Sequence, residues 1–287
     1  NVLKINSLDI KYFAFIYKKE IKEFYRNEII NFNRKLSLIS QVNHPAILNF
    51  VGYSMTDFVN LPKPVIISEY CSIKLSDKCK YLYKNNDDIS WDNSTFDDTK
   101  KLIIIYGIAS AMDFLHSHDI IHRDLKTSNI FLDENYYPKL SGFDICKNTK
   151  DINNEKSNKI KGTPAYLAPE VYKNHEYSKS SDVYSYSLIL YELYTCMKPF
   201  EEYNNPQQIR TFLLTKEGRP TIQIPLNTTY RQLIDRCWSQ DKNQRPTFSE
   251  IVNDLKTNPN FLTDQINKEE YFEYIKYIDE SQNKFEQ

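Results

Sequence analysis

The chain has 287 residues, and its 37 lysine and arginine residues nearly balance 38 aspartate and glutamate residues, giving a net charge of −1. This balance provides no electrostatic reason to expect a nucleic acid or an anionic membrane as a partner. The longest apolar run, residues 102–112, is too short to span a bilayer and predicts a buried core helix. A chain of this length forms one large domain or two small domains around a substantial core.

The first part of the chain alternates strand-like and helical patterns. Residues 9–19 alternate aromatic and aliphatic side chains and predict a strand. Residues 20–43 predict a helix that ends at the His-Pro pair 44–45, because proline disfavours helix in the residue before it. Residues 46–54 and 64–70 predict two further strands. The helical spacing comes from Ile21, Phe24, Tyr25, Ile29, Phe32, Leu36 and Ile39.

The pattern becomes mainly helical from Asp97, where acidic residues suit a helix N-terminus. Polar residues at 84–96 and 147–161 predict loops. The helices predicted in this part span residues 97–117, 181–196, 229–238 and 247–256.

These elements predict an α+β fold with two lobes. Residues 1–70 form a small, mainly β lobe with one helix, and residues 71–258 form a larger, mainly helical lobe. A tail over 259–287 begins at Pro259 and carries one apolar helical stripe, which either packs back on the large lobe or docks to a partner. The stripe consists of Ile266, Tyr271, Tyr274, Ile275 and Ile278.

The five cysteines are scattered, and no CxxC pair or Cys/His cluster indicates a zinc site or a disulfide framework. They are Cys71, Cys79, Cys146, Cys196 and Cys237. No stretch typical of a secretory signal peptide precedes the first predicted element. We therefore expect a reduced, cytoplasmic chain.

Residues 122–129, His-Arg-Asp-Leu-Lys-Thr-Ser-Asn, carry the clearest chemical signal. Phosphoryl transfer needs a carboxylate that orients the attacking hydroxyl and an amide oxygen that holds a metal ion on the phosphates. Asp124 and Asn129 match these two roles, and Lys126 adds a positive charge for the transferring group. Three further motifs follow in order: Gly-Thr-Pro-Ala-Tyr-Leu-Ala-Pro-Glu at 162–170, an aspartate at 182, and an Arg-Pro pair at 245–246.

With these motifs, residues 5–257 resemble the eukaryotic protein kinases, serine/threonine type, most similar to the tyrosine-kinase-like branch. The resemblance implies a two-lobed kinase fold in which Asp182 anchors the catalytic-loop backbone and Glu170 pairs with Arg245. It also implies that Arg123 receives an activation-loop phosphate and that Thr163 contacts the catalytic loop. Candidate phosphate acceptors are Thr149, Ser157 and Thr163. His122 and Phe143 are implied to stack with Ile39 in a hydrophobic column between the lobes.

The resemblance further implies a nucleotide site between the lobes. Ser68 is the implied gatekeeper, and Glu69 and Cys71 flank Tyr70 in the implied hinge. If Ala14 takes the place of alanine in the Val-Ala-Ile-Lys motif, Ile16 occupies the lysine position, whereas a shift by two residues places Lys18 there on the same strand face. We favour Lys18 as the ion-pair donor. The residues assigned to the nucleotide are Ala14, Lys18, Ser68, Glu69, Cys71 and Leu132.

The sequence departs from the kinase pattern around the phosphates. Gly142-Phe143-Asp144 stands where the family has Asp-Phe-Gly, so the metal-binding aspartate is replaced by Gly142 and Asn129 is the remaining metal ligand. Asp144 lies two residues on, roughly 6–7 Å along an extended chain, which is too far for metal coordination. Lys35 occupies the position of the helix glutamate and cannot pair with a strand lysine.

No glycine precedes Gly52, so the glycine-rich loop is also absent from these residues. We therefore expect a pseudokinase that acts as a signalling or scaffolding module for a protein partner, with weak or no binding of ATP and Mg²⁺. The alternative is an active serine/threonine kinase that transfers the ATP γ-phosphate to protein hydroxyls with atypical metal binding. A kinase-like fold acting on a small molecule is a minor third reading, which residues 162–170 argue against.

Overall fold

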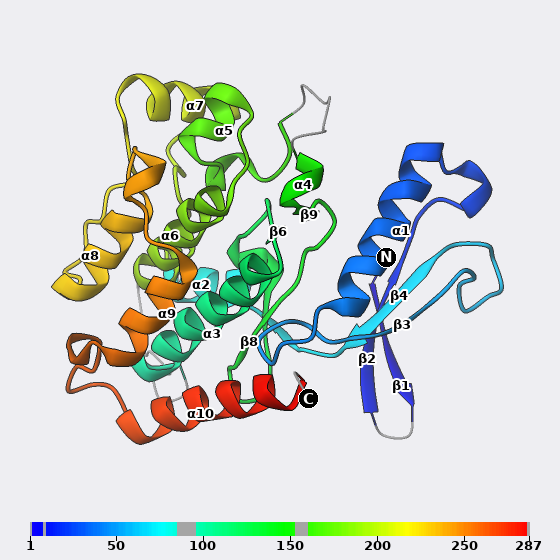
Figure 1. Ribbon diagram of the computed structural model, residues 1–287, viewed down its shortest axis with the longest axis horizontal. Helices are drawn as coiled ribbons and strands as arrows, with labels where there is room; N and C mark the ends of the chain where they lie inside the picture. The colour runs from blue at the N-terminus through cyan, green and yellow to red at the C-terminus, as the bar shows by residue number, and fades with distance from the viewer. Residues whose placement is uncertain (1, 8–9, 85–95, 153–159, 286–287) are drawn as a thin grey trace.

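The computed structural model describes residues 2–7, 10–84, 96–152 and 160–285. They form a small strand-rich lobe and a larger helical lobe (Figure 1), so the predicted α+β two-lobed fold is confirmed. None of the described helices is both long enough and apolar enough to cross a membrane.

The small lobe is built on one antiparallel sheet with the strand order β1-β2-β4-β3. Its strands are β1 (Val2–Ser7), β2 (Ile10–Ile16), β3 (Phe50–Ser54) and β4 (Val65–Glu69). Strand β1 was not predicted, and β2 ends three residues before the predicted strand does. In β2, Phe13 lies opposite Ser68 and Phe15 lies opposite Ile66. Because side chains alternate along a strand, Phe13 and Phe15 share one face.

A single helix, α1 (Arg26–Gln41), packs against this sheet after a short 3-10 turn, η1 (Ile21–Glu23). The predicted helix was longer at both ends. Its true start is fixed by Glu28, whose carboxylate accepts the backbone N–H of Tyr25 at 2.8 Å. Phe32 is buried and meets Tyr17 edge-on, with ring centroids 5.2 Å apart.

The large lobe surrounds α3 (Asp98–Ser117), whose residues from Leu102 to Met112 are buried, as predicted for a core helix. Asp97 caps this helix by accepting the backbone N–H of Lys100 at 2.9 Å. The other helices of the lobe are α2 (Leu75–Lys84), α4 (Thr149–Ile152), α5 (Pro169–Asn174), α6 (Lys179–Thr195), α7 (Pro206–Thr215), α8 (Thr228–Cys237) and α9 (Phe248–Thr257).

Short strands and 3-10 turns shape the side of the large lobe that faces the small lobe. The strands are β5 (Ile73–Lys74), β6 (Ile120–Ile121), β7 (Ile130–Leu132), β8 (Pro138–Leu140) and β9 (Lys147–Asn148). The 3-10 turns are η2 (Thr127–Asn129), η3 (Pro164–Tyr166), η4 (Lys242–Gln244) and η5 (Pro259–Phe261). Strand β9 and helix α4 lie inside the predicted loop at 147–161. Most of the loop predicted at 84–96 lies outside the described residues.

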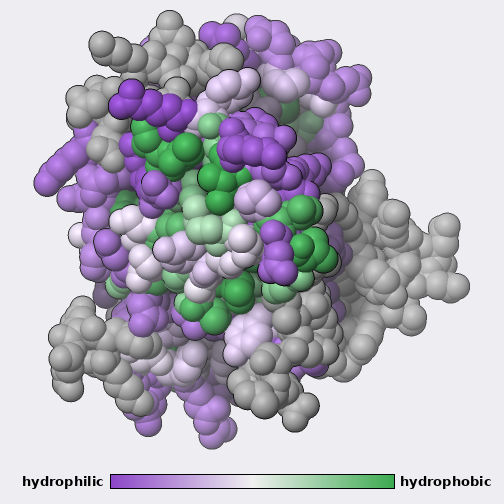
Figure 2. Space-filling model, turned by 90° about the vertical axis from the view of Figure 1, so that its right-hand side faces the viewer, coloured by the Kyte–Doolittle hydropathy of each residue, from purple (hydrophilic) through white to green (hydrophobic). Residues whose placement is uncertain are grey.

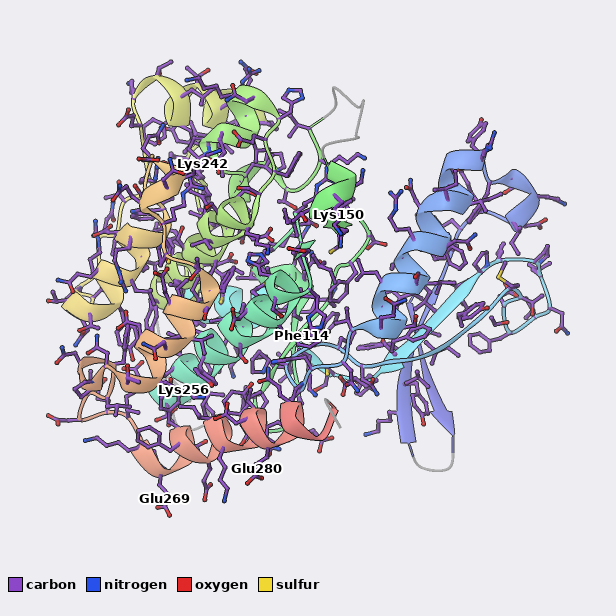
Figure 3. All side chains as sticks on the ribbon, in the orientation of Figure 1. Phe114, Lys150, Lys242, Lys256, Glu269 and Glu280 are labelled. Atoms are coloured by element: carbon purple, nitrogen blue, oxygen red, sulfur yellow. The ribbon has the colours of Figure 1, made fainter. Side chains whose placement is uncertain are left out.

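The tail forms helix α10 (Lys268–Phe285), and its predicted apolar stripe packs back on the large lobe. Tyr274 lies against Tyr137, with ring centroids 4.5 Å apart, and reaches Gly107 of α3. Lys256 of α9 lies above α10 (Figure 3) and pairs with Asp279 at 2.8 Å. Of the two alternatives for this stripe, packing on the large lobe is the one that the structure adopts.

Apolar side chains are unusually exposed on the small lobe, and Figure 2 shows them gathered among polar ones on its outer face. They come from the start of α1 and from the β3–β4 hairpin: Tyr25, Ile29, Ile30, Val51, Tyr53, Met55, Phe58, Val59 and Leu61.

Candidate functional site

The three predicted catalytic residues lie together in the segment between β6 and β7. Lys126 Nζ is 2.8 Å from Asp124 Oδ2, and Asn129 Nδ2 donates to the Asp124 carbonyl at 2.7 Å. Thr163 Oγ1 donates to Asp124 Oδ1 at 2.7 Å and accepts from Lys126 Nζ at 2.6 Å. The structure therefore brings Thr163 to the catalytic loop, where the resemblance implies it.

Buried polar contacts hold this loop in place. Asp182 is 1% exposed, and its carboxylate accepts the backbone N–H groups of His122 and Arg123 at 2.8 and 2.9 Å. Glu170 accepts two parallel bonds from the Arg245 guanidinium at 2.7 and 2.9 Å. Both arrangements correspond to the anchoring roles that the resemblance implies.

Arg123 lies with its guanidinium 4.2 Å from the centre of the Tyr177 ring. The Tyr177 hydroxyl in turn accepts the backbone N–H of Lys161 at 2.6 Å, which ties Arg123 to the segment before residue 162. Thr149 begins α4, and Ser157 lies outside the described residues. Phosphate recognition by Arg123 stays a prediction.

His122 and Phe143 lie side by side, as the resemblance implies, but their rings are tilted by 56° and not stacked. His122 is fully buried, and its ring centroid lies 5.4 Å from that of Phe143. Burial lowers the pKa of His122. Its Nε2 lies 2.9 Å from the Ser141 carbonyl, so the neutral ring donates this hydrogen bond. Ile39 is partly buried and packs on the same core.

Gly142 has a left-handed φ of +88° and lies directly against Asn129. A Cβ atom at this position would come 2.4 Å from Asn129 Nδ2 and 2.5 Å from its Cγ. The position that carries the metal-binding aspartate in the resembling family thus has neither a side chain nor space for one while Asn129 stays in place.

Lys35 has a partner that the sequence analysis did not identify. Its Nζ lies 2.5 Å from Asp144 Oδ1, so the carboxylate displaced from position 142 neutralises the lysine on α1. Burial favours neutral Lys35, but the charge of Asp144 and the contact with Tyr17 outweigh it and raise the pKa of Lys35. Lys35 therefore stays charged, and the α1 helix is tied to the turn at Asp144 across the lobes.

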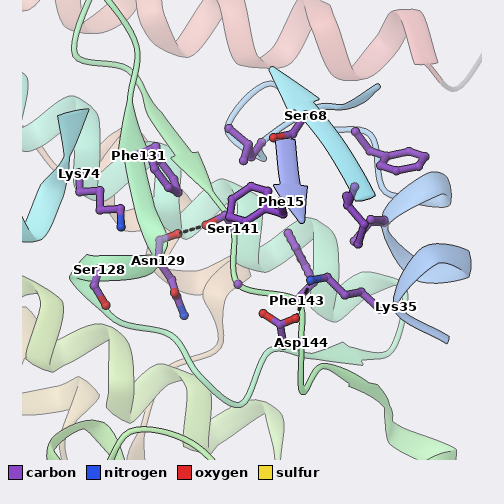
Figure 4. A pocket seen from close by; sticks show the side chains of 15 residues that line it. Phe15, Lys35, Ser68, Lys74, Ser128, Asn129, Phe131, Ser141, Phe143 and Asp144 are labelled. Atoms are coloured by element: carbon purple, nitrogen blue, oxygen red, sulfur yellow. Dashed lines mark hydrogen bonds and ion pairs between the residues drawn. The ribbon is translucent and has the colours of Figure 1, made fainter. Parts of the chain in front are cut away.

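A cavity of about 180 Å³ lies between the lobes beside this ion pair (Figure 4). Lys35 and Asp144 lie at its lower side, and Ser68 and Phe15 approach from the sheet. Its walls come from α1, from strands β2, β3, β4, β5 and β7, from the turn η2, from Leu48 and from the segment 141–144. They consist of Phe15, Lys35, Ile39, Leu48, Phe50, Ile66, Ser68, Lys74, Ser128, Asn129, Phe131, Ser141, Gly142, Phe143 and Asp144.

The assignment of Ala14 and Lys18 to the nucleotide site was wrong. Ala14 is fully buried on the opposite face of β2 from Phe15, which lines the cavity. Lys18 follows the end of the strand, is exposed and borders a separate hollow with Glu28. From β2, Phe15 lines the cavity opposite Ile66, whereas neither Ile16 nor Lys18, the two candidates for the strand lysine, lines it.

The residue assigned to the nucleotide site from β7 was wrong by one position. Leu132 is fully buried away from the cavity, and its neighbour Phe131 lines the wall. Among the six residues assigned to the nucleotide, Ser68 alone lines this cavity. Glu69 bonds the backbone N–H of Asn49 at 2.7 Å, and Cys71 is 2% exposed.

Three aromatic rings meet where the cleft approaches the hinge. Phe13 of β2 lies 5.6 Å from Phe131 of β7 and 4.8 Å from Tyr70, measured between ring centroids. Sequence reasoning missed Phe13, Phe15 and Phe131. The signal was present, because aromatic residues at alternate positions 13, 15 and 17 mark one face of a strand.

The comparisons with known proteins agree with this architecture. Residues 15–255 match the family model described as protein tyrosine and serine/threonine kinase. The chain belongs to the protein kinase family. A probable serine/threonine-protein kinase of Dictyostelium discoideum is 31% identical over 235 residues, which are 82% of this chain and 17% of that protein.

Two further kinases are similar to this chain over about the same share of its length. The serine/threonine-protein kinase CTR1 of Arabidopsis thaliana is 30% identical over 237 residues, 82% of this chain and 27% of the relative. The dual specificity protein kinase shkB of Dictyostelium discoideum is 29% identical over 229 residues, 79% of this chain and 34% of the relative. The chain thus spans about a third or less of the length of these kinases.

Protein kinases use ATP with Mg²⁺, and the described residues of this kinase domain fit that pair poorly. Gly142 offers no carboxylate and Asp144 is engaged by Lys35. The Asn129 amide nitrogen donates to Asp124, which leaves the amide oxygen as the one remaining metal-ligand atom among these three residues. Within the described ranges, no group of three or more acidic, histidine or cysteine side chains is placed to hold a metal ion.

Proposed function

We propose that this kinase domain is a pseudokinase: a binding module for protein partners in signalling or scaffolding, with weak or no phosphoryl transfer. Weak or absent binding of ATP and Mg²⁺ is part of the proposal. So is membership of the tyrosine-kinase-like branch, on the motifs at 236–252. We also propose a cytoplasmic location, because all five cysteines are free.

The contact between Phe13 and Phe131 carries this proposal. A base that reaches the hinge must pass between β2 and β7, the strands on either side of the cleft. A flat base between two rings needs about 7 Å between the ring planes, twice an ordinary carbon–carbon contact. The two centroids are 5.6 Å apart, and Tyr70 closes the third side. The space for adenine is therefore filled by side chains.

The phosphate end of the cleft supports the same proposal. Strand β2 contributes Phe15 and no cation to the cavity, and Gly142 stands where the family has its metal-binding aspartate. One preorganised electrostatic contact contributes about 100–1000-fold in rate. Although such losses do not add simply, two of them leave little transfer.

An active serine/threonine kinase is the second candidate, favoured by the assembled network of Asp124, Lys126, Asn129 and Thr163. In that case ATP would enter only after Phe13 leaves Phe131, and the metal would be bound through Asn129 with a displaced Asp144. The ion pair between Asp144 and Lys35 opposes this, because the carboxylate would have to leave its partner.

Two measurements on the full chain test the proposal. We expect no thermal stabilisation by ATP with Mg²⁺ or Mn²⁺, and no radiolabel transfer to a generic protein substrate above that of Asp124→Ala. The Asp124→Ala variant controls for contaminating kinases. Mg²⁺-dependent transfer that disappears in Asp124→Ala would show that the pseudokinase proposal is wrong and that the second candidate is right.

A further inference from the structure

We propose that the cavity between the lobes binds a small aromatic carboxylate with one ring, whose carboxylate takes the place of Asp144 on Lys35. The inference rests on the proposed function, since it assigns a ligand other than ATP to the same cleft. It draws on the size of the cavity, the chemistry of its walls and the unequal exposure of the two ion-pair partners.

The size of the cavity limits the ligand to one ring. Sites for drug-sized ligands and cofactors have volumes of about 300–1,000 Å³, and this cavity has about 180 Å³. An engineered apolar cavity of about 150 Å³ in another protein accommodates benzene. A benzene-sized ring therefore fits here.

The apolar residues of the lining suit an aromatic ring. They are Ile39 of α1, Leu48, Phe50 of β3, Ile66 of β4 and Phe15 of β2. Aliphatic and aromatic walls favour transfer of an apolar ring out of water. Ser68 also lines the cavity, and its small side chain leaves space for the ring.

Lys35 supplies the charge that selects a carboxylate. Its side chain is only 17% exposed and lines the cavity, whereas the Asp144 side chain is 67% exposed. A buried ammonium group needs a counter-ion, but an exposed carboxylate returns to water at little cost. A ligand carboxylate that arrives with an apolar ring can therefore replace Asp144, because ring burial adds to its affinity.

Replacement of Asp144 has a structural consequence. The Lys35–Asp144 pair joins α1 of the small lobe to the turn after Gly142 in the large lobe. A ligand on Lys35 releases that turn while keeping Lys35 neutralised. Ligand binding is thus linked to the position of the 142–145 segment, and removal of Asp144 must strengthen binding.

The test is a titration of the full chain with benzoate, followed by calorimetry or by protein NMR shifts. We expect Lys35→Gln to weaken benzoate binding about tenfold or more, because it removes a charge-assisted contact. Asp144→Ala should tighten it about two- to fivefold, because it removes the competing carboxylate. Benzyl alcohol is a neutral ligand of similar shape. It should bind the unmodified chain more weakly than benzoate does, whereas benzyl alcohol and benzoate should bind Lys35→Gln with equal affinity.

The exposed pair Lys276–Glu280 of α10 provides matched controls. Lys276→Gln and Glu280→Ala remove equivalent charges away from the cavity and from α1, and should leave benzoate affinity unchanged. Ser68→Phe fills the ring space and should abolish binding. Thermal unfolding of each variant shows whether it is folded, and the gain in Asp144→Ala cannot arise from misfolding.

The proposal is overturned if benzoate binds neither the unmodified chain nor Asp144→Ala, or if Lys35→Gln binds it as well as the unmodified chain does. Loss of binding in Lys74→Gln with none in Lys35→Gln would place the carboxylate on the wrong lysine and also overturn it. ATP with Mg²⁺ is titrated in parallel. Binding of ATP overturns the proposed function, whereas failure of benzoate alone overturns only this inference.

Discussion

Restoring the missing carboxylate by Gly142→Asp should destabilise the domain rather than repair it. The new Cβ would lie 2.4 Å from Asn129 Nδ2, closer than such atoms approach, and the φ of +88° disfavours a side chain. The backbone conformation costs about 1 kcal/mol, and overpacking costs about 1–3 kcal/mol. The free energy of unfolding should therefore fall by about 2–4 kcal/mol.

Calorimetric or circular-dichroism melting measures this loss. For a chain of this size we expect the Tm to fall by about 3–7 °C. Gly52→Asp is the matched control, because a Cβ at Gly52 meets nothing within 4 Å, and its cost should stay within about 1 kcal/mol. Gly142→Asp should also show no stabilisation by ATP with Mg²⁺, because the contact between Phe13 and Phe131 persists.

The contact with Asn129 is isolated by a double-mutant cycle. An Asn129→Ala background removes the two closest contacts and leaves only the Cβ atom of residue 129, at 3.0 Å. Gly142→Asp should therefore cost less there and approach the backbone term of about 1 kcal/mol. If Gly142→Asp is as stable as the unmodified chain, or if its cost is the same in both backgrounds, Asn129 does not restrict position 142 and the reasoning is refuted.

Three further predictions concern stability. Glu170→Gln should lower the free energy of unfolding by about 3–5 kcal/mol in urea titrations, because it leaves the buried Arg245 guanidinium without a charge partner; an effect no larger than that of Lys276→Gln, which breaks an exposed pair, would contradict this. Gly107→Ala should lower the free energy of unfolding by about 1–2 kcal/mol, because a Cβ there meets the Tyr274 hydroxyl and Pro138. An unchanged Tm would contradict this, because it would show that α10 moves away from α3 at no cost in stability. Burial and the charge of Lys139 lower the pKa of His44 from 6.5 to about 3. Between these values the unfolded state binds a proton that the folded state does not, so stability should fall as pH decreases below 6.5, by about 1.4 kcal/mol per pH unit at most. His44→Gln should lose this part of the pH dependence, and equal slopes in both proteins would contradict the assignment.

The long elements could be predicted because their patterns are local. Helix α3 was predicted to within one residue at its start, since an apolar run of this length with an acidic cap leaves few alternatives. The catalytic loop was also predictable, because Asp124, Lys126 and Asn129 lie within six residues and are brought together by one turn.

Strand faces were less predictable. Ala14, Lys18 and Leu132 were assigned to the cleft, although Phe15 and Phe131 line it. A shift of one residue moves every side chain to the other face of a strand, and strand patterns with apolar residues on both faces do not reveal which face meets the cleft. The pairing of β2 with β4 decided the register.

The sequence by itself determined that this chain is a two-lobed kinase domain and that position 142 lacks its carboxylate, because both depend on motifs read in chain order. Only the tertiary structure decided that Asp144 pairs with Lys35, 109 residues away, and that Phe13 reaches Phe131 across the lobes. These contacts join segments that are remote along the chain. Their geometry depends on how the lobes pack, and no local pattern records it.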